Sequence, residues 1–470
     1  MPDSLSRQLA RWAVNLDAAD LPPAVVDKMQ TSLLHATVVA IVGAGTHHGE
    51  AAVNLTLAEE ASAHGASILA SGGRATRCGA AFANSKLMHA TNQADSYRML
   101  THPGPCVIPA ALASAQLGGA TGAQLLTAMA AAYEVESRIA GDFIASTQAR
   151  GFRSSPIYGT LGAAVATGKL LGLTEDQMVT AIALACTFTA GTNEGPRSGG
   201  REMMFHEPQS TRSGIMAALL AREDVRGSEE ALEGAAGFYN AFTGNNRGEL
   251  SYVFTGPQRV SFEPVTEGLG TRWDLLHTVL KMYPTAGYNC PVIDLMTDIR
   301  RSHQLAIDEI ERITIDMNWL ETLYPSPAFP NPSRGQAIVG STHYFTAYVA
   351  VNGSYPPLRT RIDPGDGSEA ATAENHDAVL SLMHKVQIVG HKDRPAFAPR
   401  ITIDMAGGNV YRGEYQGNEL EWGLDTEVER LQPLFPQIHW PTEKLEATVG
   451  AVRDIPNAAD ISDLIVAATP

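Results

Sequence analysis

The sequence predicts a mainly α protein, in which a large all-helical domain is interrupted by a smaller α+β domain. Apolar residues recur at helical spacing from the start of the chain to about Trp273, and the alternation typical of strands begins only after that point. Helical patterns return in the tail. We therefore predict that residues 1–273 and 418–470 form the helical domain and that residues 274–417 form the α+β domain.

The elements of the helical domain follow from turn residues and spacing. Leu21-Pro22-Pro23 opens a helix, because prolines suit a first helical turn, and Gly43-Ala44-Gly45 ends it. Further helices are predicted at residues 107–117, 122–140, 159–171, 176–190 and 212–223. Their apolar faces are rich in alanine and glycine, so we expect a closely packed, mostly buried bundle.

The α+β domain is predicted from four alternating segments, at residues 310–318, 385–389, 400–405 and 410–415. Helical runs lie between them at residues 292–302 and 342–351, and a polar, acidic loop covers residues 363–377. The tail is predicted to be helical at residues 425–434, 442–453 and 459–468.

Composition excludes several classes of function. The chain has 470 residues and a formal net charge of −16, which argues against a nucleic-acid or anionic-membrane partner. Four separated cysteines form no CxxC pair, which excludes a disulfide framework and fits a reducing compartment. The N-terminus lacks the pattern of a secretory signal, and the most apolar stretches, residues 36–45 and 160–173, are too short or too polar to cross a bilayer. We expect a cytoplasmic protein.

Common cofactor motifs are absent from the sequence. The glycines at 43, 45 and 49 have the wrong spacing for a dinucleotide loop and follow a helix, not a strand. No G-x-S-x-G elbow, complete phosphate loop or metal-spaced histidine cluster occurs. We expect neither a cofactor nor a metal.

Three polar stretches interrupt otherwise apolar or glycine-rich sequence. Asn92–Pro105 contains Asp95, Ser96, Thr101 and His102, and is either part of a site or a solvated loop. Gly151–Thr160 places Arg153 before a buried helix, as an anion site or as a plain N-cap. Gly195–Arg212 holds Arg201 and His206, as an anion-wrapping loop or as a flexible surface loop.

Two shorter motifs belong to the second domain or its boundary. Lys281-Met282-Tyr283-Pro284 lies at the predicted domain junction, where pockets are favoured, although such a lysine is usually a surface residue. Ser341-Thr342-His343-Tyr344 heads a predicted helix, where the serine can cap and the tyrosine can pack.

Taken in order, these pieces resemble the MmgE/PrpD family over nearly the whole chain. The resemblance rests on the Leu-Pro-Pro opening, Thr101-His102-Pro103, the run from Tyr158 to Leu173, His206 followed by Arg212-Ser213-Gly214, Lys281-x-Tyr283-Pro284 and Ser341-x-x-Tyr344. The family includes 2-methylcitrate dehydratase, cis-aconitate decarboxylase and iminodisuccinate epimerase. It implies a helical domain with an α+β lid, a homodimer, and a cofactor-free site between the domains that takes small di- and tricarboxylates.

The resemblance also implies roles for individual residues. His102, Lys281 and Tyr344 stand where family members place catalytic residues, and Asp95 falls in the acidic stretch of the same site. We expect His102 or Lys281 to be the base, Tyr344 the acid, and Asp95 the group that orients one of them. The expected substrate-binding residues are Asn92, Ser96, Thr101, Arg153, Arg201 and His206.

Four positions depart from the family pattern. Asn92 replaces an aspartate, Arg153 a histidine, Met203 a lysine and Ala286 a histidine. Arginine is always charged, so Arg153 exchanges an acid–base group for a carboxylate clamp. Three hypotheses stay open: a lyase that dehydrates or decarboxylates a small polycarboxylate, an isomerase or epimerase on the same scaffold, and a protein that binds an anion without turnover.

Overall fold

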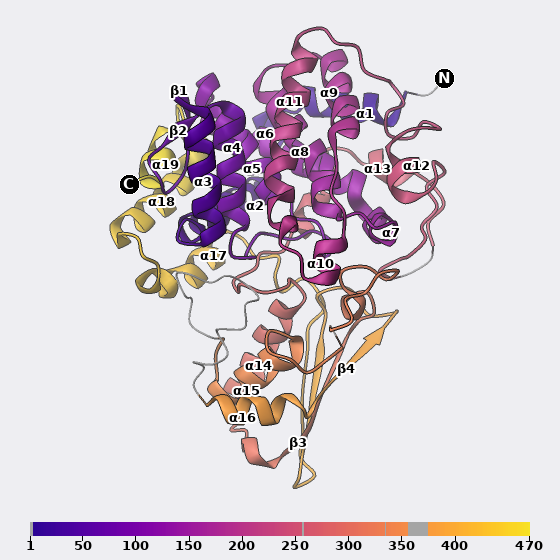
Figure 1. The fold of residues 1–470 in the computed structure, drawn as a ribbon, viewed down its shortest axis with the longest axis vertical. Helices are drawn as coiled ribbons and strands as arrows, with labels where there is room; N and C mark the ends of the chain where they lie inside the picture. Colours follow the sequence, from indigo (N-terminus) through magenta and orange to yellow (C-terminus); the bar gives the residue numbers. More distant parts are fainter. Residues whose placement is uncertain (1–2, 256–257, 334, 356–374) are drawn as a thin grey trace.

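The computed structural model describes residues 3–255, 258–333, 335–355 and 375–470, and these are mainly α-helical (Figure 1). The first part of the chain forms α1 (Leu5–Asn15), α2 (Pro23–Gly43), α3 (His47–Glu60), α4 (Arg77–His89), α5 (Gly104–Gly118), α6 (Gly122–Ala140), α7 (Ile144–Ala149), α8 (Ser154–Leu170), α9 (Glu175–Phe188), α10 (Glu194–Ser198), α11 (His206–Arg222), α12 (Phe238–Thr243) and α13 (Glu263–Thr266). The helices predicted from spacing are confirmed, with ends shifted by a few residues.

Helix α8 is the centre of this bundle, because α5, α6, α9 and α11 all pack against it. Its neighbours approach closely where side chains are small. A Cβ at Gly214 of α11 would meet the Thr160 carbonyl of α8 at 2.5 Å, so only glycine permits this contact. The alanine- and glycine-rich faces thus allow the helix axes to approach closely, as the sequence predicts.

The prediction that residues 1–273 are all helical is wrong at one place. Two short antiparallel strands, β1 (Ala61–Ser67) and β2 (Arg74–Ala75), lie beside α3 and α4. The alanine-rich sequence of β1 resembles helix. Gly65 nevertheless packs directly on the Ala75 backbone, where a Cβ would collide, and this close approach of two chains favours the strand pair.

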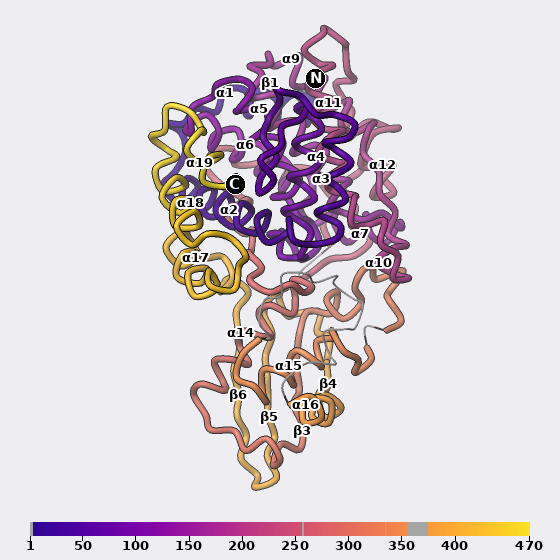
Figure 2. The backbone as a smooth tube through the Cα atoms, turned by 60° about the vertical axis from the view of Figure 1, so that its left-hand side comes forward, coloured from indigo at the N-terminus to yellow at the C-terminus, as the bar shows by residue number. Residues whose placement is uncertain are grey.

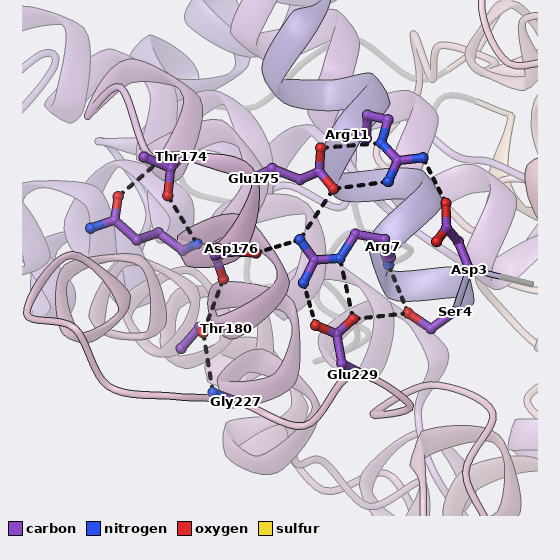
Figure 3. Close-up of polar contacts among 11 residues, drawn as sticks. Asp3, Ser4, Arg7, Arg11, Thr174, Glu175, Asp176, Thr180, Gly227 and Glu229 are labelled. Atoms are coloured by element: carbon purple, nitrogen blue, oxygen red, sulfur yellow. Dashed lines mark hydrogen bonds and ion pairs between the residues drawn. The ribbon is translucent and has the colours of Figure 1, made fainter. Parts of the chain in front are cut away.

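The N-terminal helix is fastened to the bundle by a surface network of charges (Figure 3). Arg7 of α1 is bonded to Glu175 at 3.1 Å and Asp176 at 2.5 Å, both at the start of α9, and also to Glu229. Arg11 joins Glu175 to Asp3. Single exposed pairs contribute little, but this network fixes α1 against α9 and the loop after α11.

A buried ion pair fixes the end of α6 to the segment that leads to Lys281. Glu134 and Arg138 are fully buried and paired, and Glu134 also accepts the backbone N–H groups of Asp274 and Leu275. Arg138 donates to the carbonyls of Glu267, Gly268 and Arg272.

Arg138→Met is therefore expected to destabilise the protein by about 3–5 kcal/mol, because it leaves a buried carboxylate without its countercharge. Urea unfolding followed by circular dichroism measures this loss. The control is Arg247→Met, which removes only the exposed Arg247–Glu249 pair and should leave the midpoint unchanged. Equal midpoints for the two variants would contradict the assignment.

Helix α2 differs from the expectation about apolar stretches. Of the stretch 36–45, residues 36–43 are the end of this helix, and the whole helix, Pro23–Gly43, is long and apolar enough by length and composition to cross a membrane. In its most apolar window 83% is buried inside the protein, and a core helix passes the same test. The C-terminal helices cover it: α17 (Leu424–Leu431) and α18 (Thr442–Asp454) pack against α2, next to α19 (Ser462–Ala467) (Figure 2).

The second part of the chain forms a four-stranded sheet with helices against it (Figure 1). Its elements are α14 (Asn289–Ser302), β3 (Ile310–Asn318), α15 (Thr342–Asn352), α16 (His376–Met383), β4 (Val386–His391), β5 (Arg400–Met405) and β6 (Val410–Glu414). The order is β4-β3-β5-β6, with β4 parallel to β3 and the other pairs antiparallel. All four predicted strands are present. The predicted acidic loop lies mostly outside the described residues, and its last two residues, His376 and Asp377, begin α16.

Candidate active site

A cavity of about 250 Å³ lies where the helical bundle meets the segment before α14. Five parts of the chain line it: the end of α4 with the loop after it, the N-terminal side of α8, the loop around α10, residues 281–288, and Tyr324. Among the predicted site residues, those that line it are Asn92, His102, Arg153, Arg201 and Lys281.

His102 is held in one tautomer by the backbone. Its Nδ1 lies 2.6 Å from the carbonyl oxygen of Asp95. A carbonyl only accepts, so Nδ1 carries the proton and Nε2 keeps a free electron pair when the ring is neutral. Burial, Lys281 and His89 lower the pKa of His102 well below its usual value, so the ring is neutral at pH 7.

The Asp95 carboxylate does not orient His102 or Lys281 by a side-chain hydrogen bond. It accepts instead from the Tyr133 hydroxyl at 2.7 Å and from the Gly104 N–H, at the start of α5, at 2.9 Å. Burial raises its pKa despite these donors. Asp95 acts on His102 through its main chain, and its side chain fixes the loop to α5 and α6.

Lys281 is buried, with 2% of its surface exposed. Burial lowers its pKa to about 8, an effect that Cys290 and Asp95 partly oppose. Ser96 and Val279 exchange two backbone hydrogen bonds, which place the segment that contains Lys281 beside the loop that contains His102. Ser96 thus contributes to the site by position, and it is not among the residues that line the cavity.

The buried side chain of His35 also holds the loop between α4 and α5 in place. His35 of α2 lies 2.7 Å from the Glu427 carboxylate of α17 and 2.7 Å from the Gln93 carbonyl. Both partners only accept, so both ring nitrogens carry protons. Burial alone would lower the pKa of His35, but Glu427 and the Gln93 carbonyl outweigh it and raise the pKa.

Arg153 is buried and paired with Glu207 of α11. The hydroxyl groups of the two following serines already have hydrogen-bond partners within the protein. Ser154 and Ser155 donate to the Leu100 carbonyl, and Ser155 also accepts from the His102 N–H. The start of α8 therefore holds the His102 loop, and its contribution to the cavity is Arg153 itself.

The Gly195–Arg212 stretch is not a single loop. It contains α10, a short 3₁₀ turn and the start of α11. Arg201 lines the cavity with Gly195, Gly199 and Gly200, whereas Arg197 pairs with Glu194 and Arg212 with Glu60.

The other predicted site residues lie outside the cavity lining. Thr101 bridges to Tyr97 through the backbone, His206 begins α11, and Tyr344 packs its ring near Phe345 and Tyr348 in α15. Two other tyrosines, Tyr288 and Tyr324, line the cavity.

Sequence reasoning missed His89 and Glu207. His89 is the last residue of α4 and lines the cavity, and its Nδ1 lies 3.4 Å from a Glu207 oxygen. The signal was a lysine and a histidine, Lys86 and His89, in the last turn of a small-residue helix directly before the first polar stretch.

All four positions that depart from the family pattern line the cavity: Asn92, Arg153, Met203 and Ala286. The four positions therefore lie in the cavity and not on a remote surface. In the described ranges, no group of three or more His, Cys, Asp or Glu residues is arranged to hold a metal ion.

Comparisons with known proteins agree with the family resemblance. A model of the MmgE/PrpD N-terminal domain matches residues 7–251. The chain is 24% identical to the cis-aconitate decarboxylase-like protein oryM of Aspergillus oryzae, over 98% of this chain and 96% of that protein. It is 28% identical to a cis-aconitate decarboxylase of Aspergillus terreus, over 60% of this chain and 57% of that protein. The human cis-aconitate decarboxylase matches at 29% identity over 41% of this chain and 42% of that enzyme.

Proposed function

Because the chain belongs to the MmgE/PrpD family, we propose that it is a lyase that decarboxylates a small tricarboxylate of the cis-aconitate type in the cavity around His102. The full-length relative supports this reaction class by name, as do the shorter matches to decarboxylases.

The observation that carries the proposal is the charge of the cavity lining. The described lining residues include three cationic side chains, Arg153, Arg201 and Lys281, and no carboxylate. The chain as a whole has a formal net charge of −16, so this concentration of positive charge is local. A small polyanion is the ligand that such a lining favours.

The same charges suit decarboxylation. The carbon–carbon bond to one carboxylate breaks, carbon dioxide leaves, and the electron pair stays on the carbon framework beside the remaining carboxylates. Cations already in place stabilise that developing charge. A proton must then be added to the framework, and His102 and Lys281 are the predicted proton-transfer residues that line the cavity and can supply or relay it.

Lys281 gives this proposal a pH dependence. With a pKa of about 8, its ammonium is present below pH 8 and lost above it. We expect kcat/KM, which reports the free enzyme, to be level just below pH 8 and to fall by up to about tenfold per pH unit above it.

The control for the fall in kcat/KM above pH 8, the alkaline limb of the profile, is Lys281→Arg, because arginine stays charged throughout this range. Its kcat/KM should be lower overall but should not fall above pH 8. An unchanged alkaline limb in the variant would assign the titration to another group.

The experiment that tests the function is proton NMR in heavy water with cis-aconitate and related di- and tricarboxylates. The proposal expects a decarboxylated product that carries one deuterium from solvent. A dehydrated product, or exchange with a change of configuration only, would replace the decarboxylase by a dehydratase or an epimerase. Binding without change in any acid would leave only the anion-binding hypothesis.

A further inference from the structure

At the wall of the cavity, one ring nitrogen of His89 faces one carboxylate oxygen of Glu207. Nδ1 of His89 and Oε2 of Glu207 lie 3.4 Å apart, and neither has a hydrogen-bond partner among the described residues. The other Glu207 oxygen is bonded to Arg153. In sites without substrate such contacts are often long and shorten when the complex forms.

The charges around this pair determine its protonation. Arg153 and His102 lower the pKa of Glu207 although its burial acts in the opposite direction, so Glu207 is a carboxylate. Burial lowers the pKa of His89 well below its usual value, and the basic groups Arg153, Lys86, Lys281 and His206 lower it further. The ring is neutral, and a carboxylate partner draws its one proton to Nδ1.

His89 and His102 therefore carry their proton on the same ring nitrogen, Nδ1, but the acceptor that faces this nitrogen differs between them. Their ring centroids are 5.6 Å apart, and each has Nδ1 toward an acceptor and an electron pair on Nε2. The partner of His102 is a neutral carbonyl, whereas the partner of His89 is a carboxylate. The charge of Glu207 also raises the pKa of His102, but of the two rings it is His89 that has the carboxylate 3.4 Å from its Nδ1.

We propose that His89 is a second proton-transfer residue of this cavity: it takes up a proton when a tricarboxylate binds and delivers that proton to carbon after carbon dioxide has left. The inference rests on the proposed function and adds a residue and a proton source to it. The bound polyanion offsets the surrounding cations, so the imidazolium becomes stable. After the carbon–carbon bond breaks, the electron pair forms a carbon–hydrogen bond with the Nε2 proton, and neutral His89 is restored.

The test measures proton uptake on binding, which needs no turnover. The probe is tricarballylate, the saturated tricarboxylate that lacks the double bond of aconitate. Its binding is followed by isothermal titration calorimetry at one pH in buffers of different ionisation enthalpy. We expect the wild-type protein to take up protons on binding, and His89→Asn to take up fewer, by as much as one.

Asparagine is chosen because its amide can still donate to Glu207 while it lacks a basic nitrogen in place of Nε2. In turnover of cis-aconitate, His89→Asn should lower kcat about 10²–10⁴-fold with a much smaller change in KM. The matched control is His47→Asn, an exposed histidine at the start of α3, which should behave as wild type. His89→Gln is the second variant if the asparagine variant does not fold.

Three outcomes overturn the inference: no proton uptake by the wild-type protein, equal uptake by wild type and His89→Asn, or an unchanged kcat in that variant. Failure of the proposed function looks different. In that case uptake depends on His89, but the wild-type protein converts no tricarboxylate.

Discussion

Replacing His102 with asparagine is expected to lower kcat for tricarboxylate turnover about 10²–10⁴-fold while the fold stays intact. The asparagine amide can keep donating to the Asp95 carbonyl, which in the native protein receives the Nδ1 proton at 2.6 Å. What the variant loses is Nε2, the ring nitrogen that carries a free electron pair. Steady-state kinetics with cis-aconitate measure the loss.

The fold control for this variant is its circular dichroism spectrum and melting temperature, and the matched variant is again His47→Asn. Turnover by His102→Asn within about threefold of wild type would remove His102 from the chemistry. It would leave the residue a role in holding the loop between α4 and α5.

The second large effect is on stability and concerns the Arg153–Glu207 pair. Arg153→Met is expected to destabilise the protein by about 3–5 kcal/mol, because Glu207, which is fully buried, then keeps a charge without its partner. Urea unfolding gives the change in midpoint. The variant should also lose tricarboxylate affinity, since it removes one of the cations of the cavity.

The double variant Arg153→Met with Glu207→Met distinguishes this explanation from a loss of packing. Removing both charges leaves no uncompensated ion, so the double variant should be more stable than Arg153→Met alone. Additive losses would show that the two side chains do not depend on one another.

Local patterns predicted much of the fold. The prolines at 22 and 23 and the glycines after residue 42 mark the ends of α2, and the alternation at residues 310–318 and 400–405 gives two paired strands. The strands β1 and β2 were not predicted, because an alanine-rich sequence favours helix in isolation. The strand forms only through pairing with the neighbouring segment. The first strand is defined by contact with Ala75, which no local pattern records.

The cavity was predicted in part for a similar reason. Asn92, His102 and Arg153 lie within polar stretches that stand out in apolar sequence, and all three line it. Glu207 also lies in a polar stretch, Gly195–Arg212, but nothing in the sequence distinguishes it there, because its importance comes from contacts with Arg153 and His89, on segments far from it in the chain. Asp95 shows the opposite case: the residue type drew attention, but its backbone carbonyl makes the contact with His102.

The central claim is that this cavity removes carbon dioxide from a tricarboxylate and that His102 takes part in the reaction. The most direct measurement is ¹³C NMR with cis-aconitate labelled in its carboxyl carbons, recorded side by side for the wild-type protein and His102→Asn. We predict growth of a labelled bicarbonate signal with the wild-type protein, at least about 10²-fold faster than with the variant. Consumption of the substrate without labelled bicarbonate, or equal rates for the two proteins, would contradict the claim.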